Sequence, residues 1–432
     1  MDLSIPRHIL FKRTSVVFIL CNVLSLVNII VPISPGALVA LLCVFLILLY
    51  SKTLLYFFSQ KENSLFILYC LSQAVSLIYL AITPVSYNFL TAHPTLFLES
   101  TSYILIPQVF FYFLGFMSGK IGTADKNVER LYWITFWCLA FSLYLHFFKP
   151  AFYQNYIDNA FDGIFDTQAI LPRLNGYFSS MILGMLCSLN FVLTFKFIKN
   201  YKTQMLMIFF LIVVAILIFQ RGAWLSIGLA SVIMVSFNLK RYFFQRYQRF
   251  SLSKLKVVGV YILFLAVASF LLIYFAIKFD LFSLFTFDLV ERLTNPGDAV
   301  AERSFLWDNT IDLLKRYPYG IGFGMLTHKA ADLNFKYAVP DGNYFRIVGE
   351  SGFVSLAIFS VMSLLAVYKL YMSDRKFLSL GLLLFLVQAI GTNVFDLYYC
   401  SFIFWFILGI SFSKNYIKLN GNKEGHLSFN SI

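Results

Sequence analysis

"MLMIFFLIVVAILIFQRGAWLSIGLASVIMVSF", residues 205–237, is almost wholly apolar, with one break at Gln220, Arg221 and Gly222. A single helix across the apolar run 203–239 would be roughly 55 Å long. That length is well beyond the roughly 30 Å hydrocarbon core of a bilayer. Two helices that meet at the break are each short but long enough to cross. The stretch therefore predicts two membrane-spanning helices joined at Arg221.

The composition of the whole chain agrees with a membrane protein. Of its 432 residues, 59% are hydrophobic and 13% are charged, whereas soluble domains have about 45–50% and about 25%. These values exclude soluble, disordered, collagen-like and disulfide-scaffold classes. The six cysteines all lie in apolar runs without a CxxC pair, so we interpret them as small hydrophobic residues. We predict an all-α polytopic integral membrane protein, with residues 1–432 forming one multi-span domain.

The distribution of charge predicts the topology. Twelve spans with both termini in the cytoplasm place about two thirds of the 34 basic residues on the cytoplasmic side, as the positive-inside rule requires. Without the break at Arg221, the basic block 240–256 would lie outside. We therefore interpret the net charge of +13 as a topology signal and a contact with anionic lipid, with no nucleic-acid partner. The predicted spans are 16–33, 37–58, 64–83, 101–118, 131–148, 176–195, 203–219, 222–239, 256–277, 343–368, 377–394 and 397–413.

A long extracytoplasmic loop is predicted at residues 278–342. Its charge is mixed, and connections of this length are usually functional. Within it, residues 301–318 predict an amphipathic helix that Pro318 ends. We expect this helix to lie on the membrane face or over a cavity. Its apolar members are Phe305, Leu306, Ile311, Leu313 and Leu314.

Three arginines on the predicted outer side are candidates for anion binding. Arg221 at the helix junction must snorkel to lipid phosphate, pair with protein or bind an anion. Arg173 lies just before a span, where the alternative is an ordinary interfacial arginine. Arg303 lies in the long loop, where the alternative is a solvated ion pair. Together they suit a lipid-linked phosphate or diphosphate, because guanidinium groups bind oxyanions in a bidentate manner.

The tenth span opens with further polar residues, in "PDGNYFRIVGESGF". Asp341 can take a proton from a sugar hydroxyl, or it can cap the helix or lie solvated in the loop. Asn343 shares a helix face with Glu350. Arg346 and Glu350 are spaced i,i+4, which also suits a structural ion pair. His328 is the only histidine of the long loop, and a lone loop histidine is often incidental.

No motif for a metal, a nucleoside triphosphate or a serine nucleophile occurs in the sequence. "GIGFG" at 320–324 misses the GxGxxG spacing, and no two aspartates stand two apart as in a DxD pair. We therefore expect no cofactor.

Several segments in order resemble one family of bacterial envelope enzymes. They are "RLNGYFSS" before a span, "QRGAW" at an outer helix junction, "RSFLW" in the long loop, then "YPYGIGFG" and "DGNYFRIVGESGFVSL". The chain resembles the O-antigen ligase/polymerase superfamily over roughly residues 170–355.

The resemblance implies a membrane glycosyltransferase that takes a glycan from undecaprenyl diphosphate at the outer leaflet of the bacterial inner membrane, without a metal. It implies that Arg221 and Arg303 hold the diphosphate leaving group and that Arg173 lines the same cavity. From their positions in the sequence, we expect His328, Asn343, Arg346 and Glu350 to contact substrate. Its expected partners are the lipid-linked oligosaccharide, membrane lipid and a chain-length regulator protein.

The resemblance leaves three functions to be separated. Ligases of this superfamily usually carry a His–Asn pair at the start of the span after the long loop, whereas this chain has Asp341 and Gly342. This difference favours a polymerase that extends a lipid-linked repeat unit at its non-reducing end. The alternatives are a ligase that transfers finished glycan to another acceptor and a flippase for lipid-linked oligosaccharide. A flippase is expected to line its interior with basic residues throughout both halves and to contain paired repeats. In this sequence the non-terminal arginines cluster on one predicted face, and no paired repeat is found.

Overall fold

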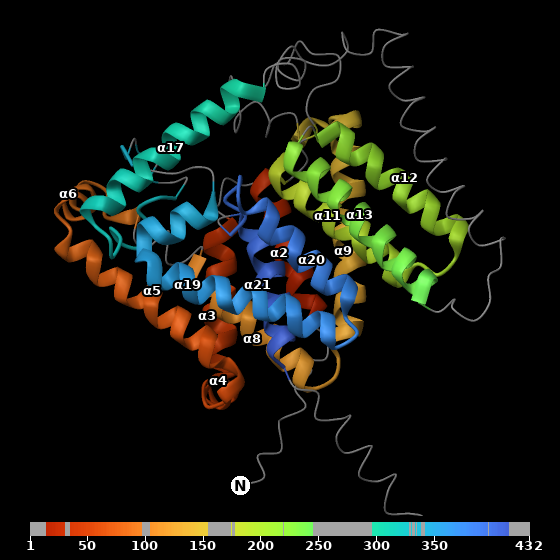
Figure 1. Ribbon diagram of the computed structural model, residues 1–432, viewed down its shortest axis with the longest axis horizontal. Helices are drawn as coiled ribbons and strands as arrows, with labels where there is room; N and C mark the ends of the chain where they lie inside the picture. The colour runs from red at the N-terminus through yellow and green to blue at the C-terminus, as the bar shows by residue number, and fades with distance from the viewer. Residues whose placement is uncertain are drawn as a thin grey trace, which may run out of the picture.

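The computed structural model describes residues 14–30, 35–96, 104–153, 174, 178–218, 220–244, 296–327, 330, 333, 335–337, 342–395 and 397–413. Within these residues the regular elements are helices, which confirms the predicted all-α fold for this part of the chain (Figure 1). The main helices are α2 (Ser15–Ile30), α3 (Pro35–Leu49), α4 (Ser51–Phe58), α5 (Ser64–Ile82), α6 (Pro84–Ala92), α8 (Ile106–Lys120), α9 (Ala124–Phe148), α11 (Ser180–Phe197), α12 (Tyr201–Ile218), α13 (Arg221–Phe244), α17 (Pro296–Arg316), α19 (Asn343–Met372), α20 (Lys376–Gln388) and α21 (Tyr398–Phe412).

The apolar helices are those of an integral membrane protein. Among the described residues, five helices are long and apolar enough to cross a membrane, or six if the bent pair α3–α4 forms one span. Four shorter apolar helices lie at other predicted spans: Ser15–Val27, Gly222–Met234, Lys376–Gln388 and Tyr398–Phe412. The predicted span 256–277 lies outside the described residues. The total of twelve spans and the division into one domain therefore stay predictions.

The predicted span 37–58 is bent in the structure. The chain forms α3 and α4, and the segments Ala37–Leu49 and Ser51–Phe58 are bent by 83°. A polar run, Ser51-Lys52-Thr53, follows the apolar helix directly, and a straight continuation would carry the Lys52 charge along the apolar axis. The bend leaves Lys52 exposed while Thr53 and Phe57 are buried.

The predicted break at Arg221 is confirmed. Helix α12 ends at Ile218 and α13 begins at Arg221, and the two helices lie together at the right of Figure 1. The indole N–H of Trp224 donates a hydrogen bond to the carbonyl oxygen of Ala215 across the break, at 2.7 Å. This bond ties the first turn of α13 to the last turn of α12.

The core is centred on α21, whose side chains are almost all buried. It packs against α8 at two glycines that touch opposite backbones. A Cβ at Gly115 would meet the carbonyl of Phe406, and a Cβ at Gly409 would meet the carbonyl of Tyr112. Small residues at such crossings let membrane helices approach closely. The two helices therefore form a tight central pair around which the others pack.

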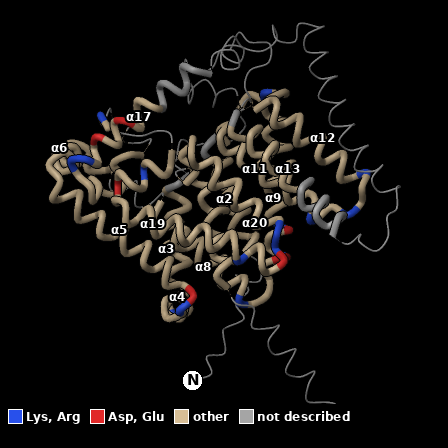
Figure 2. The backbone as a smooth tube through the Cα atoms, in the orientation of Figure 1, with Lys and Arg blue, Asp and Glu red and all other residues tan. Residues whose placement is uncertain are grey.

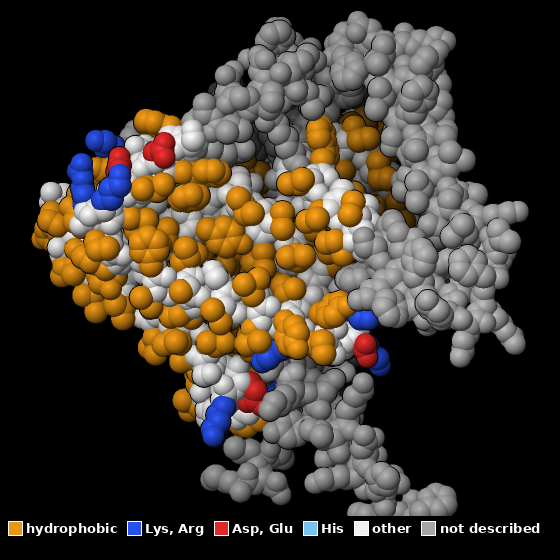
Figure 3. Space-filling view, viewed as in Figure 1, with side chains coloured by type: hydrophobic (Ala, Val, Ile, Leu, Met, Phe, Trp, Pro, Cys, Tyr) orange, Lys and Arg blue, Asp and Glu red, His pale blue; other side chains and the backbone are white. Residues whose placement is uncertain are grey.

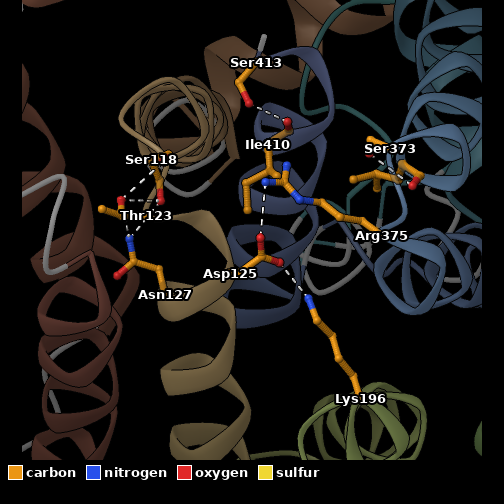
Figure 4. Close-up of polar contacts among 10 residues, drawn as sticks. Ser118, Thr123, Asp125, Asn127, Lys196, Ser373, Arg375, Ile410 and Ser413 are labelled. Carbon is orange, nitrogen blue, oxygen red and sulfur yellow. Dashed lines mark hydrogen bonds and ion pairs between the residues drawn. The ribbon is translucent and has the colours of Figure 1, made fainter. Parts of the chain in front are cut away.

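One cluster of charged side chains lies at one end of the bundle (Figures 2 and 4), and a second group lies on α17 (Figure 2). Asp125 at the start of α9 pairs with Lys196 at 2.7 Å and with Arg375 at 3.4 Å. Lys120 lies 3.7 Å from Glu62. The charge distribution of the sequence places the segments that carry these residues on one side of the membrane, and the structure brings them to one end. That this end faces the cytoplasm stays a prediction.

Two further hydrogen bonds join other segments that are far apart in the sequence. The backbone N–H of Leu174 donates to the carbonyl oxygen of Leu217 at the end of α12, at 2.8 Å. The hydroxyl of Ser86 donates to the carbonyl oxygen of Ile321. Between the two ends, the visible face carries a broad apolar band (Figure 3).

The amphipathic helix predicted at 301–318 is confirmed as α17, and Pro318 lies just beyond its end. Leu313 and Leu314 are buried, whereas Phe305 and Ile311 are exposed. Only part of the predicted apolar face is therefore covered. Residues 278–295 of the predicted long loop lie outside the described residues, and so does the side chain of Leu306.

Candidate functional site

The structure describes the predicted site residues to different extents. The side chains of Asn343, Arg346 and Glu350 are described and buried in the first turns of α19. Arg221 and Arg303 have described backbones, as the first residue of α13 and a residue of α17, but their side chains lie outside the described part. The remaining predicted residues, Arg173, Asp341 and His328, lie outside the described residues altogether.

Asn343 joins the start of α19 to the end of α20 and the segment that follows it. Its backbone N–H donates to the carbonyl oxygen of Ala389 at 2.9 Å. Its side-chain Oδ1 accepts a hydrogen bond from the backbone N–H of Phe395 at 3.1 Å. The side-chain Nδ2 is buried and has no hydrogen-bond partner among the described residues. The carbonyl end of this amide is therefore used for structure, while the donor end is left open.

Arg221 lies beside the same end of α20. A Cβ built on its neighbour Gly222 would lie 3.8 Å from Oε1 of Gln388, the residue before Ala389. The starts of α13 and α19 therefore meet at two consecutive residues, Gln388 at the end of α20 and Ala389 just after it. Both are helix N-termini, which carry partial positive charge.

Helix α17 is attached to the start of α19 through Trp307. The rings of Trp307 and Phe345 stack at 4.9 Å between centroids, with 10° between their planes. Gly342 has a φ of +103°, and a Cβ there would lie 3.2 Å from both the Trp307 Nε1 and the carbonyl oxygen of Ile390. Arg303 lies one helical turn before Trp307. This contact brings the segment of α17 that carries Arg303 towards the start of α19.

Glu350 holds the glycine-rich segment that follows α17. Its Oε1 accepts a hydrogen bond from the backbone N–H of Leu326 at 3.0 Å. The backbone N–H groups of Ile321 and Gly322 donate to the carbonyl oxygens of Gly349 and Glu350, both at 2.9 Å. This carboxylate therefore braces a loop from inside the protein, with 1% of its surface exposed.

The contact with the loop depends on a kink in α19. Gly352 has a φ of 77°, and a Cβ there would lie 2.9 Å from the carbonyl oxygen of Tyr319. Gly320 has a φ of +95°, and a Cβ there would lie 2.5 Å from the carbonyl oxygen of Glu350. Both positive φ values favour glycine over residues with a side chain. The "GIGFG" motif therefore has a packing role against α19.

Arg346 and Glu350 interact electrostatically along α19, as their i,i+4 spacing predicts. Arg346 also acts on the hydroxyl of Tyr69, which faces it from α5. On the same side, the hydroxyl of Ser351 donates to Oε1 of Gln73 at 3.2 Å. A substrate contact by Arg346 or Glu350 stays a prediction.

An apolar groove of about 380 Å³ runs between α17 and α19. It is lined by Ile311, Leu314, Lys315, Tyr344, Phe345, Val348, Phe353 and Leu356. The predicted placement of the amphipathic helix over a cavity is thus consistent with the position of α17.

No sequence motif pointed to a group of buried polar residues beside Gly222. Gln220, Gln388, Ser188 and Ser226 are all buried there, and they come from α11, α13, α20 and the residue before α13. The available signal was an amide within a predicted span, since Gln388 stands in the otherwise apolar "GLLLFLVQAI".

The described residues form neither a metal site nor a disulfide. Among them, no group of three His, Cys, Asp or Glu side chains is placed to hold a metal ion. The six cysteines are free thiols inside helices. Their interpretation as hydrophobic packing residues agrees with this placement.

The comparisons with known proteins identify one segment of the chain. No curated protein matches the chain. Residues 206–360 match the model of the O-Antigen ligase family. The matched segment contains Arg221, Arg303 and the start of α19, and members of this family are membrane glycosyltransferase-like ligases and polymerases that act on lipid-linked glycans. Residues 206–360 of this chain are thus similar to the O-antigen ligase family.

Proposed function

We propose that this protein is a polysaccharide polymerase of the bacterial inner membrane, with its site facing outward. It transfers a growing glycan from undecaprenyl diphosphate to the non-reducing end of a lipid-linked repeat unit. The observation that carries the proposal is the meeting of the starts of α13 and α19 at Gln388 and Ala389. Arg221 is the first residue of α13, and Asp341 stands two residues before the first residue of α19.

The backbone neighbours of the other arginines support one common site. Leu174, next in sequence to Arg173, is bonded to the end of α12. Arg303 lies one turn from Trp307, which contacts Gly342. In this proposal Arg221 and Arg303 hold the diphosphate, and Arg173 lines the same space. The apolar groove beside α17 is lined in part by Tyr344, Phe345 and Val348 from the first turns of α19, and it suits an amphiphilic substrate.

The chemistry needs charge stabilisation and one proton acceptor. The acceptor hydroxyl attacks the anomeric carbon, the bond to the diphosphate oxygen breaks, and the diphosphate leaves with its negative charge. Fixed guanidinium groups and helix N-termini stabilise that growing charge. Asp341 accepts the hydroxyl proton or orients the acceptor. A chain-length regulator protein would set how many repeat units are added to one glycan.

Deletion of the gene, followed by electrophoretic profiling of the surface glycan, tests this proposal. A ladder that collapses to one repeat unit and is restored by a plasmid copy supports a polymerase. Full-length chains left on the lipid carrier identify a ligase, which the name of the matched family also permits. Loss of repeat units from the outer leaflet identifies a flippase.

A further inference from the structure

One buried amide connects three helices beside the proposed site. The side-chain Nε2 of Gln388 donates to Oγ of Ser188 in α11 at 3.1 Å and to Oγ of Ser226 in α13 at 2.7 Å. Only 4% of Gln388 is exposed. The hydroxyl of Ser188 donates a hydrogen bond to the carbonyl oxygen of Gly184 at 2.9 Å. Both N–H bonds of the Gln388 amide are therefore used to hold neighbouring helices.

The oxygen of the same amide has no hydrogen-bond partner among the described residues. Oε1 of Gln388 is buried there without such a partner, and so is Oε1 of Gln220. A Cβ built on Gly222 would lie 3.8 Å from both Gln388 Oε1 and Gln220 Nε2, so both amides face the residue that follows Arg221. Burying an amide oxygen without a partner costs about 1–3 kcal/mol.

The cost of this arrangement calls for a reason other than stability. An apolar residue of similar size, such as methionine, would fill the same space without an open oxygen. Polar side chains inside membrane helices commonly mark functional sites. The position of Gln388 suggests its role, because the next residue, Ala389, accepts the backbone hydrogen bond of Asn343 at 2.9 Å.

We propose that Gln388 is a positioning residue for the glycosyl transfer reaction. It fixes the start of α13, which carries Arg221, against the end of α20, which holds the start of α19. The inference rests on the proposed function. In it, Gln388 aligns Arg221, which holds the leaving group, with the start of α19, which lies on the acceptor side. The amide acts through Arg221 and does not contact substrate.

A positioning role predicts an effect on turnover. A misplacement of about 1 Å in an aligned site can reduce the rate about 100-fold. We expect Gln388→Met to lower kcat by about 10- to 100-fold, with little change in KM, because the guanidinium contact strengthens as charge grows on the leaving group. A merely structural amide would change the yield of folded protein but not kcat per folded molecule.

Asn190 provides the matched control. It is a fully buried amide in α11 whose Nδ2 also donates two hydrogen bonds, to Oγ1 of Thr135 at 2.9 Å and to the carbonyl oxygen of Leu186 at 2.8 Å. Its hydrogen-bond partners lie in α9 and α11 and not in α13, α19 or α20. Asn190→Leu should lower the thermal stability of the solubilised protein while leaving kcat per folded molecule near the wild-type value.

The experiment uses the full-length protein in lipid nanodiscs. The substrate is the pool of lipid-linked repeat units extracted from a strain that lacks the gene. Polymer formation is measured per folded molecule for the wild type, Gln388→Met, Ser226→Ala and their double variant. We expect Ser226→Ala to lower kcat, and we expect the double variant to be no slower than Gln388→Met alone, because both changes break one contact.

The outcomes separate this inference from the proposed function. An inactive wild-type protein overturns both. An active wild type with unchanged kcat in Gln388→Met overturns the positioning role alone, and so does a double variant whose loss is the product of the single losses. If Gln388→Met does not fold, Ser226→Ala and Gly222→Ala decide, since a methyl at 222 has room and faces both amides. Normal kcat in both of these variants overturns the inference.

Discussion

The two ends of the helix bundle differ in whether their charged and buried polar groups have partners. At the charged end, both carboxylate oxygens of Asp125 have a cationic partner, Lys196 and Arg375 (Figure 4). At the opposite end, Nδ2 of Asn343 and the Oε1 atoms of Gln220 and Gln388 are buried without hydrogen-bond partners in the described part of the chain. The first end satisfies its own charges, whereas the second retains hydrogen-bonding capacity.

This difference separates a structural region from a functional one. Buried polar groups in native proteins are nearly always paired, and exceptions are concentrated where a ligand or a catalytic role explains them. The charged end connects α9, α11 and α20, so its ion pairs hold helices together. The open end joins α13, α19 and α20 and is the better candidate for substrate. The following substitutions test that contrast, each with a control at a different place.

The largest effect is expected for Asp341→Asn, which removes the proposed proton acceptor while retaining the shape of the side chain. Loss of a general base typically costs about 100- to 10,000-fold in rate. Polymer should be nearly absent from a strain that carries the variant, with normal protein in the membrane by immunoblot. The control is Asp312→Asn in α17, an exposed acid whose pKa is lowered by the hydrogen bond from Lys315 and whose loss should leave polymer normal.

His328→Ala provides the opposing test for the identity of the base. Normal polymer from Asp341→Asn together with no polymer from His328→Ala would assign the base to His328 and refute the role of Asp341. Normal polymer from both variants would show that neither Asp341 nor His328 is the proton acceptor.

A somewhat smaller effect is expected for Arg221→Lys. Lysine keeps the charge but loses the bidentate geometry of guanidinium. Loss of one donor to a developing oxyanion costs about 100- to 1,000-fold, measured here as the rate of polymer formation. The matched change at the charged end is Arg375→Lys, where a lysine can still pair with Asp125. Equal activity of the two variants would contradict diphosphate binding by Arg221 and would favour the alternative that its side chain snorkels to lipid phosphate.

Gly320→Ala should destabilise the loop that Glu350 braces. A Cβ there lies 2.5 Å from the carbonyl oxygen of Glu350, and the residue has a φ of +95°. We expect a loss of about 1–3 kcal/mol, seen as a lower unfolding temperature of the solubilised protein. Gly228→Ala in α13 is the control, because no atom lies within 4 Å of its Cβ position. It should have no cost and should raise the unfolding temperature slightly. An unchanged unfolding temperature in Gly320→Ala would contradict the packing role of "GIGFG".

The smallest effect is expected for Asp125→Asn. It breaks the ion pairs with Lys196 and Arg375, but the Asp125 side chain is 57% exposed. Pairs at such positions contribute at most about 1 kcal/mol each. The unfolding temperature should fall slightly, less so at high salt, and polymer should remain normal. A loss of polymer with an unchanged unfolding temperature would show that the charged end has a functional role.

Local features of the sequence determined the helices and their ends. The break at Arg221 follows from length, because one helix through 203–239 exceeds the bilayer core. The helix α17 follows from its apolar spacing and from Pro318 after it. The bend between α3 and α4 was not predicted, since the apolar run appears continuous when hydropathy is averaged over a span.

The arrangement of the site was decided by tertiary structure. Helices α11 and α12 are apolar on nearly all sides, so periodicity cannot show which face meets a neighbour. The contact of Gly222 with Gln388, the bond from Asn343 to Ala389 and the brace from Glu350 to Leu326 all join residues far apart in sequence. The sequence by itself determined that polar residues interrupt apolar spans. Packing alone decided which of them meet, because in a lipid-facing bundle the partners of a buried amide depend on how helices cross and not on local pattern.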